Sequence, residues 1–198
     1  VRAFADDLAV VLRTIAGALE LLIRLFAEYA LISGLALNMP KTVLLPLSLG
    51  DLAQQAAWIR RDFPQWAAVR VARKATYLGF VLGPERGADT YAKPLDKYLE
   101  RASDWGQVGG GLLLSLTAYA VYILPVLLFV AQLDRPPSHW LRVEASAVRK
   151  LLPGPGGWCQ PRALRALPLL GFSRGLPDLD LLTTAIQARV ARWEASAT

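Results

Sequence analysis

Apolar residues recur along the first third of the chain with two different periods, which predict one long helix and several short strands. Over 13–33 they follow a helical period that places Leu22 and Phe26 on one stripe, and Gly34 follows as a left-handed C-terminal cap. Short β-prone runs flank this helix over residues 1–12, 35–38 and 41–46. The order of strand, helix and strand predicts an α+β layer in which the helix covers a small sheet.

The pattern then predicts a second helix and a hairpin before it breaks. A shorter helix spans 51–62, with Asp51 as its N-cap. Alternating positions predict two strands, 66–71 and 76–82, joined around 72–75. A run rich in Gly and Pro follows at 83–87, so we expect a domain boundary at about residues 83–90.

Beyond the boundary the pattern is helical throughout. Helical spacing predicts helices over 91–105, 112–130, 140–152, 160–170 and 178–194. Asp178 is the expected N-cap of the last of these helices. The fold class is therefore α+β, with a first domain over 1–85 and an all-α region over 90–198.

One stretch of the helical region supports two interpretations. No charged residue occurs from Gly106 to Leu133, and 112–130 is almost wholly apolar, long enough to cross a membrane. Ser115 and Pro125 interrupt the run, and no basic flank marks a cytoplasmic side. A buried core helix of a helical domain accounts for the stretch as well.

Composition narrows the classes of function. The net charge of +6 and the pI near 9.8 favour a polyanionic partner. Cys159 is the single cysteine, which rules out an internal disulfide, and one histidine, His139, cannot form a zinc cluster. The chain starts at Val1, inside a strand-like run and with no signal peptide, so we expect a fragment of a longer intracellular protein of the nucleus or cytoplasm.

Two adjacent carboxylates, Asp6 and Asp7, lie between the apolar runs at the start of the chain. Asp favours tight turns, so Ala5-Asp6-Asp7 is predicted to form the tip of a hairpin. Neighbouring carboxylates repel each other, and a hard divalent cation such as Mg²⁺ compensates them well when it also binds phosphates. The pair predicts a metal site for phosphoryl transfer, while a solvated turn is the simpler interpretation.

Three motifs follow one another along the chain: Phe4-Ala5-Asp6-Asp7, then Ser33-Gly34-Leu35 with Asn38 and Lys41-Thr42, then Tyr77-Leu78-Gly79. Their order resembles the C-terminal half of the palm of a non-LTR retrotransposon reverse transcriptase. In this family an aromatic-Ala-Asp-Asp hairpin precedes a helix, a Ser-Gly-Leu-x-x-Asn-x-x-Lys-Thr/Ser segment and a Tyr-Leu-Gly hairpin. The resemblance covers about residues 1–85, and a looser one extends over 116–133 into a thumb-like helical region.

The resemblance implies roles for individual residues. Asp6 and Asp7 would be catalytic carboxylates that hold Mg²⁺ or Mn²⁺, with Asp6 bridging the metals. Lys41 would lie near the triphosphate, where a lysine neutralises charge or protonates the leaving group. Tyr77, Leu78 and Gly79 would support the primer strand. The implied partners of the complete enzyme are an RNA template, a DNA primer and deoxynucleoside triphosphates, with no membrane.

The resemblance also implies what the fragment lacks. The family takes a further metal-binding aspartate and its fingers from sequence before this region, so the fragment is expected to be inactive alone. Two other classes of protein stay open: a helical membrane or scaffold protein built around 112–130, and a noncatalytic nucleic-acid binder.

Overall fold

The computed structural model describes residues 2–4, 7–48 and 50–196, with only the backbone given for residues 2–4. The chain is an α+β protein, mostly helical with a few short strands. It divides into two compact units, Val1–Gly87 and Ala88–Thr198. We call the first the mixed unit and the second the helical unit.

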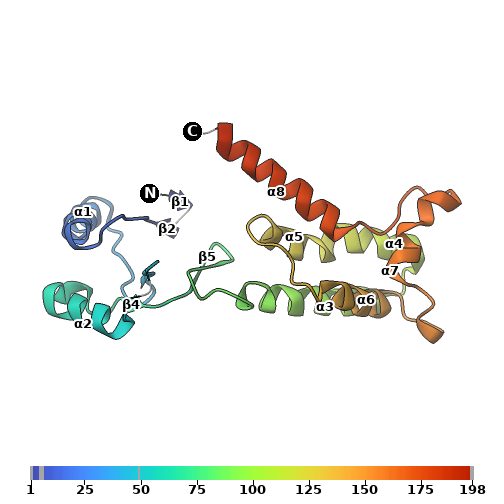
Figure 1. Cartoon of the computed structure of the whole chain (residues 1–198), viewed down its shortest axis with the longest axis horizontal. Helices are drawn as coiled ribbons and strands as arrows, with labels where there is room; N and C mark the ends of the chain where they lie inside the picture. Colours follow the sequence, from blue (N-terminus) through green and yellow to red (C-terminus); the bar gives the residue numbers. More distant parts are fainter. Residues whose placement is uncertain (1, 5–6, 49, 197–198) are drawn as a thin grey trace. The chain divides into compact units, whose positions relative to one another are not determined.

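The described residues of the mixed unit form two helices and three pairs of short strands (Figure 1). Its helices are α1 (Ala16–Ser33) and α2 (Leu52–Asp62), with a 3₁₀ turn, η1 (Pro64–Trp66). Its strands are β1 (Arg2–Phe4), β2 (Asp7–Ala9), β3 (Val43–Leu44), β4 (Arg70–Val71), β5 (Ala75–Tyr77) and β6 (Phe80–Leu82). The sequence predicted a helix that covers one small sheet, whereas the described strands form three separate two-stranded sheets.

The core of the mixed unit forms where α1, α2 and η1 meet. Its most buried side chains are Leu19, Ile59, Trp66 and Val69. The ring of Phe26, on the predicted stripe of α1, lies 6.4 Å from that of Trp66 between centroids. The helical period thus selects the packed face of α1 correctly.

Local signals at the helix ends are confirmed. Gly34 has φ 71° at the C-terminal end of α1, and its N–H donates to Ala30 O. The Asp51 carboxylate accepts a 2.8 Å hydrogen bond from Ala53 N and caps α2. Each signal acts within one turn of the helix, so it does not depend on the rest of the fold.

The predicted strand pairing is wrong in two places. The hairpin is formed by β5 and β6 around Leu78-Gly79, not by 66–71 and 76–82 around 72–75. β4 pairs instead with β3, in parallel. Residues 35–38, expected to be a strand, form none. Alternation along one strand does not identify its partner, and here a distant strand provides it.

The helical unit is formed by helices of very different lengths (Figure 1). They are α3 (Asp89–Val108), α4 (Gly111–Ala118), a π-helical turn η2 (Tyr119–Ile123), α5 (Pro125–Ala131), α6 (Trp140–Leu151), α7 (Pro161–Arg165) and α8 (Leu179–Ser196), with 3₁₀ turns η3 (Pro155–Gly157) and η4 (Leu167–Leu170). The Asp178 carboxylate accepts a hydrogen bond from Leu181 N, 3.1 Å, and so caps α8 as predicted.

A single large core joins these helices. α3 packs along α6 and α5, and α5 packs against α8. Tyr98, Tyr119, Leu127 and Val148 contribute to this core and are almost fully buried. The fully buried residues of α8, Leu179 and Thr183, lie in its first turns. The helix continues past the end of α5 toward the C-terminus (Figure 1).

The apolar stretch runs as one helical segment from Gly111 to Ala131, with a mean hydropathy of 2.3. By length and composition it could cross a membrane, and 44% of its most apolar window is buried. Pro125 has no N–H to continue a regular helix, and the π turn directly before it lets Leu124 N donate to Tyr119 O at 2.8 Å. One face of the segment thus enters the core, while side chains such as Leu113 and Phe129 are exposed.

Candidate functional site

The hairpin that precedes α1 carries the predicted aspartate pair. β1 and β2 are antiparallel, and Phe4 lies opposite Asp7. Asp7 is the first residue of β2 rather than part of the predicted turn, and its side chain is exposed. Asp6 lies outside the described residues. The described half of the pair therefore projects from the start of a strand into solvent.

Lys41 follows a turn that Asn38 organises. The side-chain oxygen of Asn38 accepts a hydrogen bond from Lys41 N, 3.2 Å. The backbone oxygen of Asn38 accepts three more, from Lys41 N, Thr42 N and the Thr42 hydroxyl, each 3.0 Å. This pattern is an Asx-type turn, which fixes the backbone of Lys41 while its side chain remains exposed.

The Tyr77-Leu78-Gly79 segment forms the tip of the β5–β6 hairpin. Leu78 has φ 48° and Gly79 has φ 84°, and positive values at both central residues are typical of a two-residue type I′ turn. Leu78 is the one non-glycine residue with positive φ in the described part of the chain. Such a conformation costs an L-residue about 1–2 kcal/mol, so the tip of the hairpin is strained at Leu78.

The three predicted site segments all belong to the mixed unit. Among the described residues, no hydrogen bond or ion pair links Asp7, Lys41 and the 77–79 turn. The described residues also contain no group of three or more His, Cys, Asp or Glu side chains that could hold a metal ion. An aspartate pair supplies too few ligands for two metal ions, so the described residues do not by themselves provide a complete two-metal centre.

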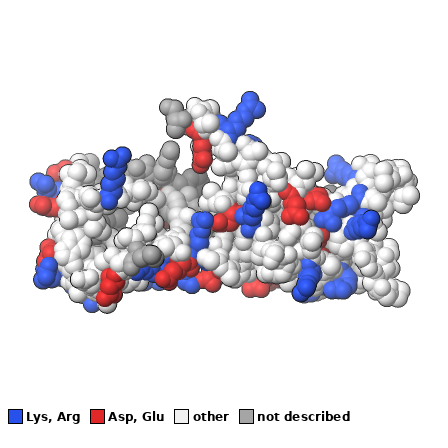
Figure 2. All heavy atoms as spheres, in the orientation of Figure 1, with Lys and Arg blue, Asp and Glu red and all other residues white. Residues whose placement is uncertain are grey.

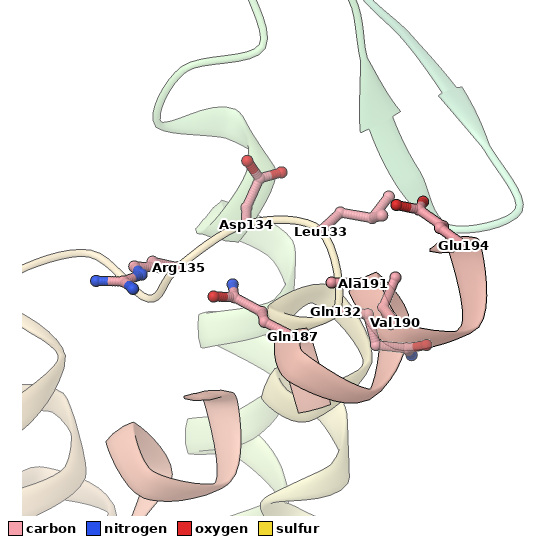
Figure 3. A pocket seen from close by; sticks show the side chains of 8 residues that line it. All are labelled: Gln132, Leu133, Asp134, Arg135, Gln187, Val190, Ala191 and Glu194. Carbon is pink, nitrogen blue, oxygen red and sulfur yellow. The ribbon is translucent and has the colours of Figure 1, made fainter. Parts of the chain in front are cut away.

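A shallow hollow in the helical unit lies between the end of α5 and α8, with a volume of about 480 Å³ (Figure 3). Its lining is mixed in charge: Gln132, Leu133, Asp134, Arg135, Gln187, Val190, Ala191 and Glu194. Figure 3 shows Asp134 and Glu194 on different sides of the hollow. Gln187 donates to Ala131 O at 3.1 Å, so this side chain fastens α8 to α5. Its charged side chains are of both signs, and we assign no reaction to the hollow.

A buried polar network in the helical unit was missed by the sequence analysis. The Tyr98 and Tyr119 hydroxyls are 2.9 Å apart, and the Tyr119 hydroxyl donates to Glu144 Oε1 at 3.1 Å. One guanidinium nitrogen of Arg165 donates to both Glu144 oxygens, at 2.7 and 2.8 Å. Arg165 Nε also lies 3.3 Å from Asp178 Oδ2. The network therefore connects α3, η2, α6, α7 and the start of α8.

Burial dominates the electrostatics of this network. It raises the pKa of Glu144, and hydrogen bonds from Arg165 and Tyr119 oppose that rise. Burial likewise raises the pKa values of the Tyr98 and Tyr119 hydroxyls well above the ordinary tyrosine value. Because the network is enclosed and its charges are paired, we interpret it as a device that aligns the helices rather than as a reaction site.

The two buried tyrosines predict a loss of stability at alkaline pH. Above pH 10 the unfolded tyrosines ionise while Tyr98 and Tyr119 keep their protons, so stability is full below about pH 10 and falls as the pH rises above it. Above pH 10, each buried tyrosine should lower the free energy of unfolding by about 1.4 kcal/mol per pH unit. Urea unfolding at pH 9 and pH 11 measures this slope. Tyr98→Phe should flatten it, because this variant lacks one of the two buried hydroxyls.

We compared the chain with known protein families, curated proteins and solved structures. No protein-family model, curated protein or solved structure matches the chain. The function has to be inferred from the motifs and the turns that carry them.

Proposed function

We propose that this chain is part of a non-LTR retrotransposon reverse transcriptase, an RNA-directed DNA polymerase. In this proposal residues 1–85 are the C-terminal part of the palm and 90–198 are a thumb-like helical region. The observation that carries it is the order of three motifs: the Asp6-Asp7 pair, the Ser33 to Thr42 segment and Tyr77-Leu78-Gly79. Each of these motifs is weak alone, and their order and spacing together favour this family.

The local geometry of the second and third motifs supports the proposal. Ser33 and Gly34 end α1, and Asn38 closes the turn that holds Lys41 and Thr42. Ser33, Gly34 and Asn38, three residues that carry the resemblance, are thus ones that shape the backbone of this segment. Leu78 and Gly79 form a tight exposed tip, which suits a segment that contacts another molecule.

The proposed roles follow the resemblance. Asp6 and Asp7 would bind Mg²⁺ or Mn²⁺ in the complete enzyme, together with an aspartate from an earlier segment. Lys41 would lie near the triphosphate, and Tyr77, Leu78 and Gly79 would support the primer. The partners would be an RNA template, a DNA primer and deoxynucleoside triphosphates. Since this chain supplies too few metal ligands, it would not polymerise alone.

Primer extension on an RNA template tests the proposal directly. The 198-residue chain with Mg²⁺ should extend no primer, and a longer chain that places reverse transcriptase fingers and an upstream palm segment before Val1 should gain activity. Extension by the short chain would refute the expected inactivity. A longer, folded chain that binds template and primer but never extends the primer would argue against a palm.

Lys41→Ala in that longer enzyme should lower kcat by about 10²-fold while KM for the nucleotide changes little. Loss of a proton donor to the leaving group affects the transition state rather than the bound nucleotide. Steady-state kinetics separate the two constants, and Lys97→Ala, at an exposed position on α3, is the matched control. A rise in KM alone would reduce Lys41 to a binding contact.

A second candidate, a helical membrane protein, rests on one observation. The segment Gly111–Ala131 is long and apolar enough to span a bilayer, and part of its surface is exposed. Its other face lies in the apolar core that it shares with α3 and α8. The experiment on Leu127 in the Discussion separates this candidate from a core helix.

A further inference from the structure

The excess positive charge of the chain is concentrated in one segment of the helical unit, residues 135–174. This segment has seven Lys and Arg residues and one acidic residue, Glu144. Its net charge of +6 equals that of the whole chain, so all other residues together are neutral. We call it the basic segment. It includes α6, α7 and the connections around them.

The fold removes the one negative charge of the basic segment from its surface. Glu144 is 1% exposed and is paired with Arg165, whose Nε also lies beside Asp178. The five cations that remain exposed beyond the start of α6 are Arg142, Arg149, Lys150, Arg162 and Arg174. On α6, Arg142 and Arg149 are seven residues apart, so both lie on the outer face opposite Glu144.

The space-filling view agrees with this distribution. Figure 2 shows Lys and Arg atoms with almost no Asp or Glu atoms over the right-hand end, where Figure 1 places α7 and its connections. The acidic side chains visible in this view lie elsewhere. A charge pattern of one sign attracts a polyanion, while a mixed surface does not.

Exposed aromatic side chains alternate with these cations along the sequence. Trp158, between Lys150 and Arg162 in the sequence, is 55% exposed, and Phe172 is 39% exposed. A Cβ atom on Gly154 would lie 2.1 Å from the indole nitrogen of Trp158, so the indole packs directly on this backbone. The ring is therefore held in place by Gly154 while much of it faces solvent.

We propose that the basic segment is a binding surface for single-stranded nucleic acid. The exposed cations would neutralise backbone phosphates, and Trp158 would stack on an unpaired base. A duplex would satisfy the cations but would offer no free base to the indole. This surface lies outside the palm motifs, so the inference does not depend on the polymerase proposal.

Charge removal in the full chain tests the electrostatic part. Fluorescence anisotropy measures the affinity for a labelled 20-nucleotide DNA strand as the salt concentration rises. The triple variant Arg142→Gln, Arg149→Gln, Arg162→Gln should bind at least tenfold more weakly in low salt. Its slope of log K against log salt should be smaller by about 2, since each phosphate contact contributes about 0.7.

A control with the same net charge distinguishes a surface from a general charge effect. Arg13→Gln, Arg24→Gln, Arg60→Gln changes three exposed arginines of the mixed unit. This variant should retain the wild-type slope and affinity within about twofold. Equal losses in the two triple variants would overturn the proposal, and so would wild-type binding that is insensitive to salt.

Trp158 tests the preference for single strands. Trp158→Ala should weaken single-strand binding about tenfold and leave duplex binding unchanged, whereas Trp158→Phe should keep most of the affinity. Circular dichroism checks that each variant is folded. Equal wild-type affinity for the strand and its duplex would contradict the stacking role. Binding to phosphatidylserine vesicles, with none to either nucleic acid, would identify an anionic membrane as the partner instead.

Discussion

Leu127→Asp is expected to unfold the helical unit. Leu127 is 1% exposed within the core that α3, α5 and their neighbours form. The substitution removes the apolar burial of a leucine, worth about 2–5 kcal/mol when a cavity remains, and adds a charge with no buried partner. The lost burial and the unpaired charge together approach or exceed the free energy of unfolding of a typical domain. Loss of helical circular dichroism and of the cooperative urea transition would measure it.

Leu113→Asp provides the matched control on the same apolar segment. Leu113 is 56% exposed, so the same change there should alter stability by less than about 1 kcal/mol if the segment is a core helix. If the segment spans a membrane, both variants should impair insertion equally. Flotation with neutral liposomes completes the comparison: we expect the folded wild-type chain to stay in the aqueous phase. Folded monomers that float would overturn the thumb-like assignment.

Asp6→Asn should abolish DNA synthesis in the longer enzyme that supplies fingers and an upstream palm segment. The substitution keeps the size of the side chain and removes the charge that the proposed metal site requires. A metal ligand contributes several kcal/mol to transition-state stabilisation, so we expect a loss of at least about 10³-fold in kcat/KM. Single-nucleotide incorporation measures it, with template binding as the check that the protein is folded.

Two further variants sharpen this result. Asp7→Asn should have a smaller effect, because the resemblance gives Asp7 the lesser share of the metal. Asp104→Asn, at an exposed position on α3, should leave synthesis unchanged. Full activity of the Asp6 variant would show that the aspartate pair is a solvated turn.

The features that the sequence predicted well are local ones. Gly34, Asp51 and Asp178 end or begin helices as expected, because a cap involves only the adjacent turn. The packed stripe of α1 follows from its helical period. The run rich in Gly and Pro at 83–87 is where the two compact units meet along the chain.

The candidate site was foreseen only as a list of residues. The motifs identified Asp6, Asp7, Lys41 and 77–79, but not the turns that hold them. Asn38 organises the Lys41 turn through hydrogen bonds, and Leu78 adopts a left-handed conformation that leucine disfavours. A charge count over a moving window would have found the basic segment, since the signal is in the sequence.

The helices, their caps and their apolar faces could be predicted from the order of the residues, because each depends on neighbours three or four residues away. The pairing of the strands and the contacts of Glu144 depend instead on how distant segments pack together. β4 pairs with β3, some 27 residues earlier in the chain, and no pattern within either strand specifies that partner. From the sequence, Glu144 would likewise be predicted to be an exposed charge on a helix. Its burial between Tyr119 and Arg165 exists only because α6, η2 and α7 pack together.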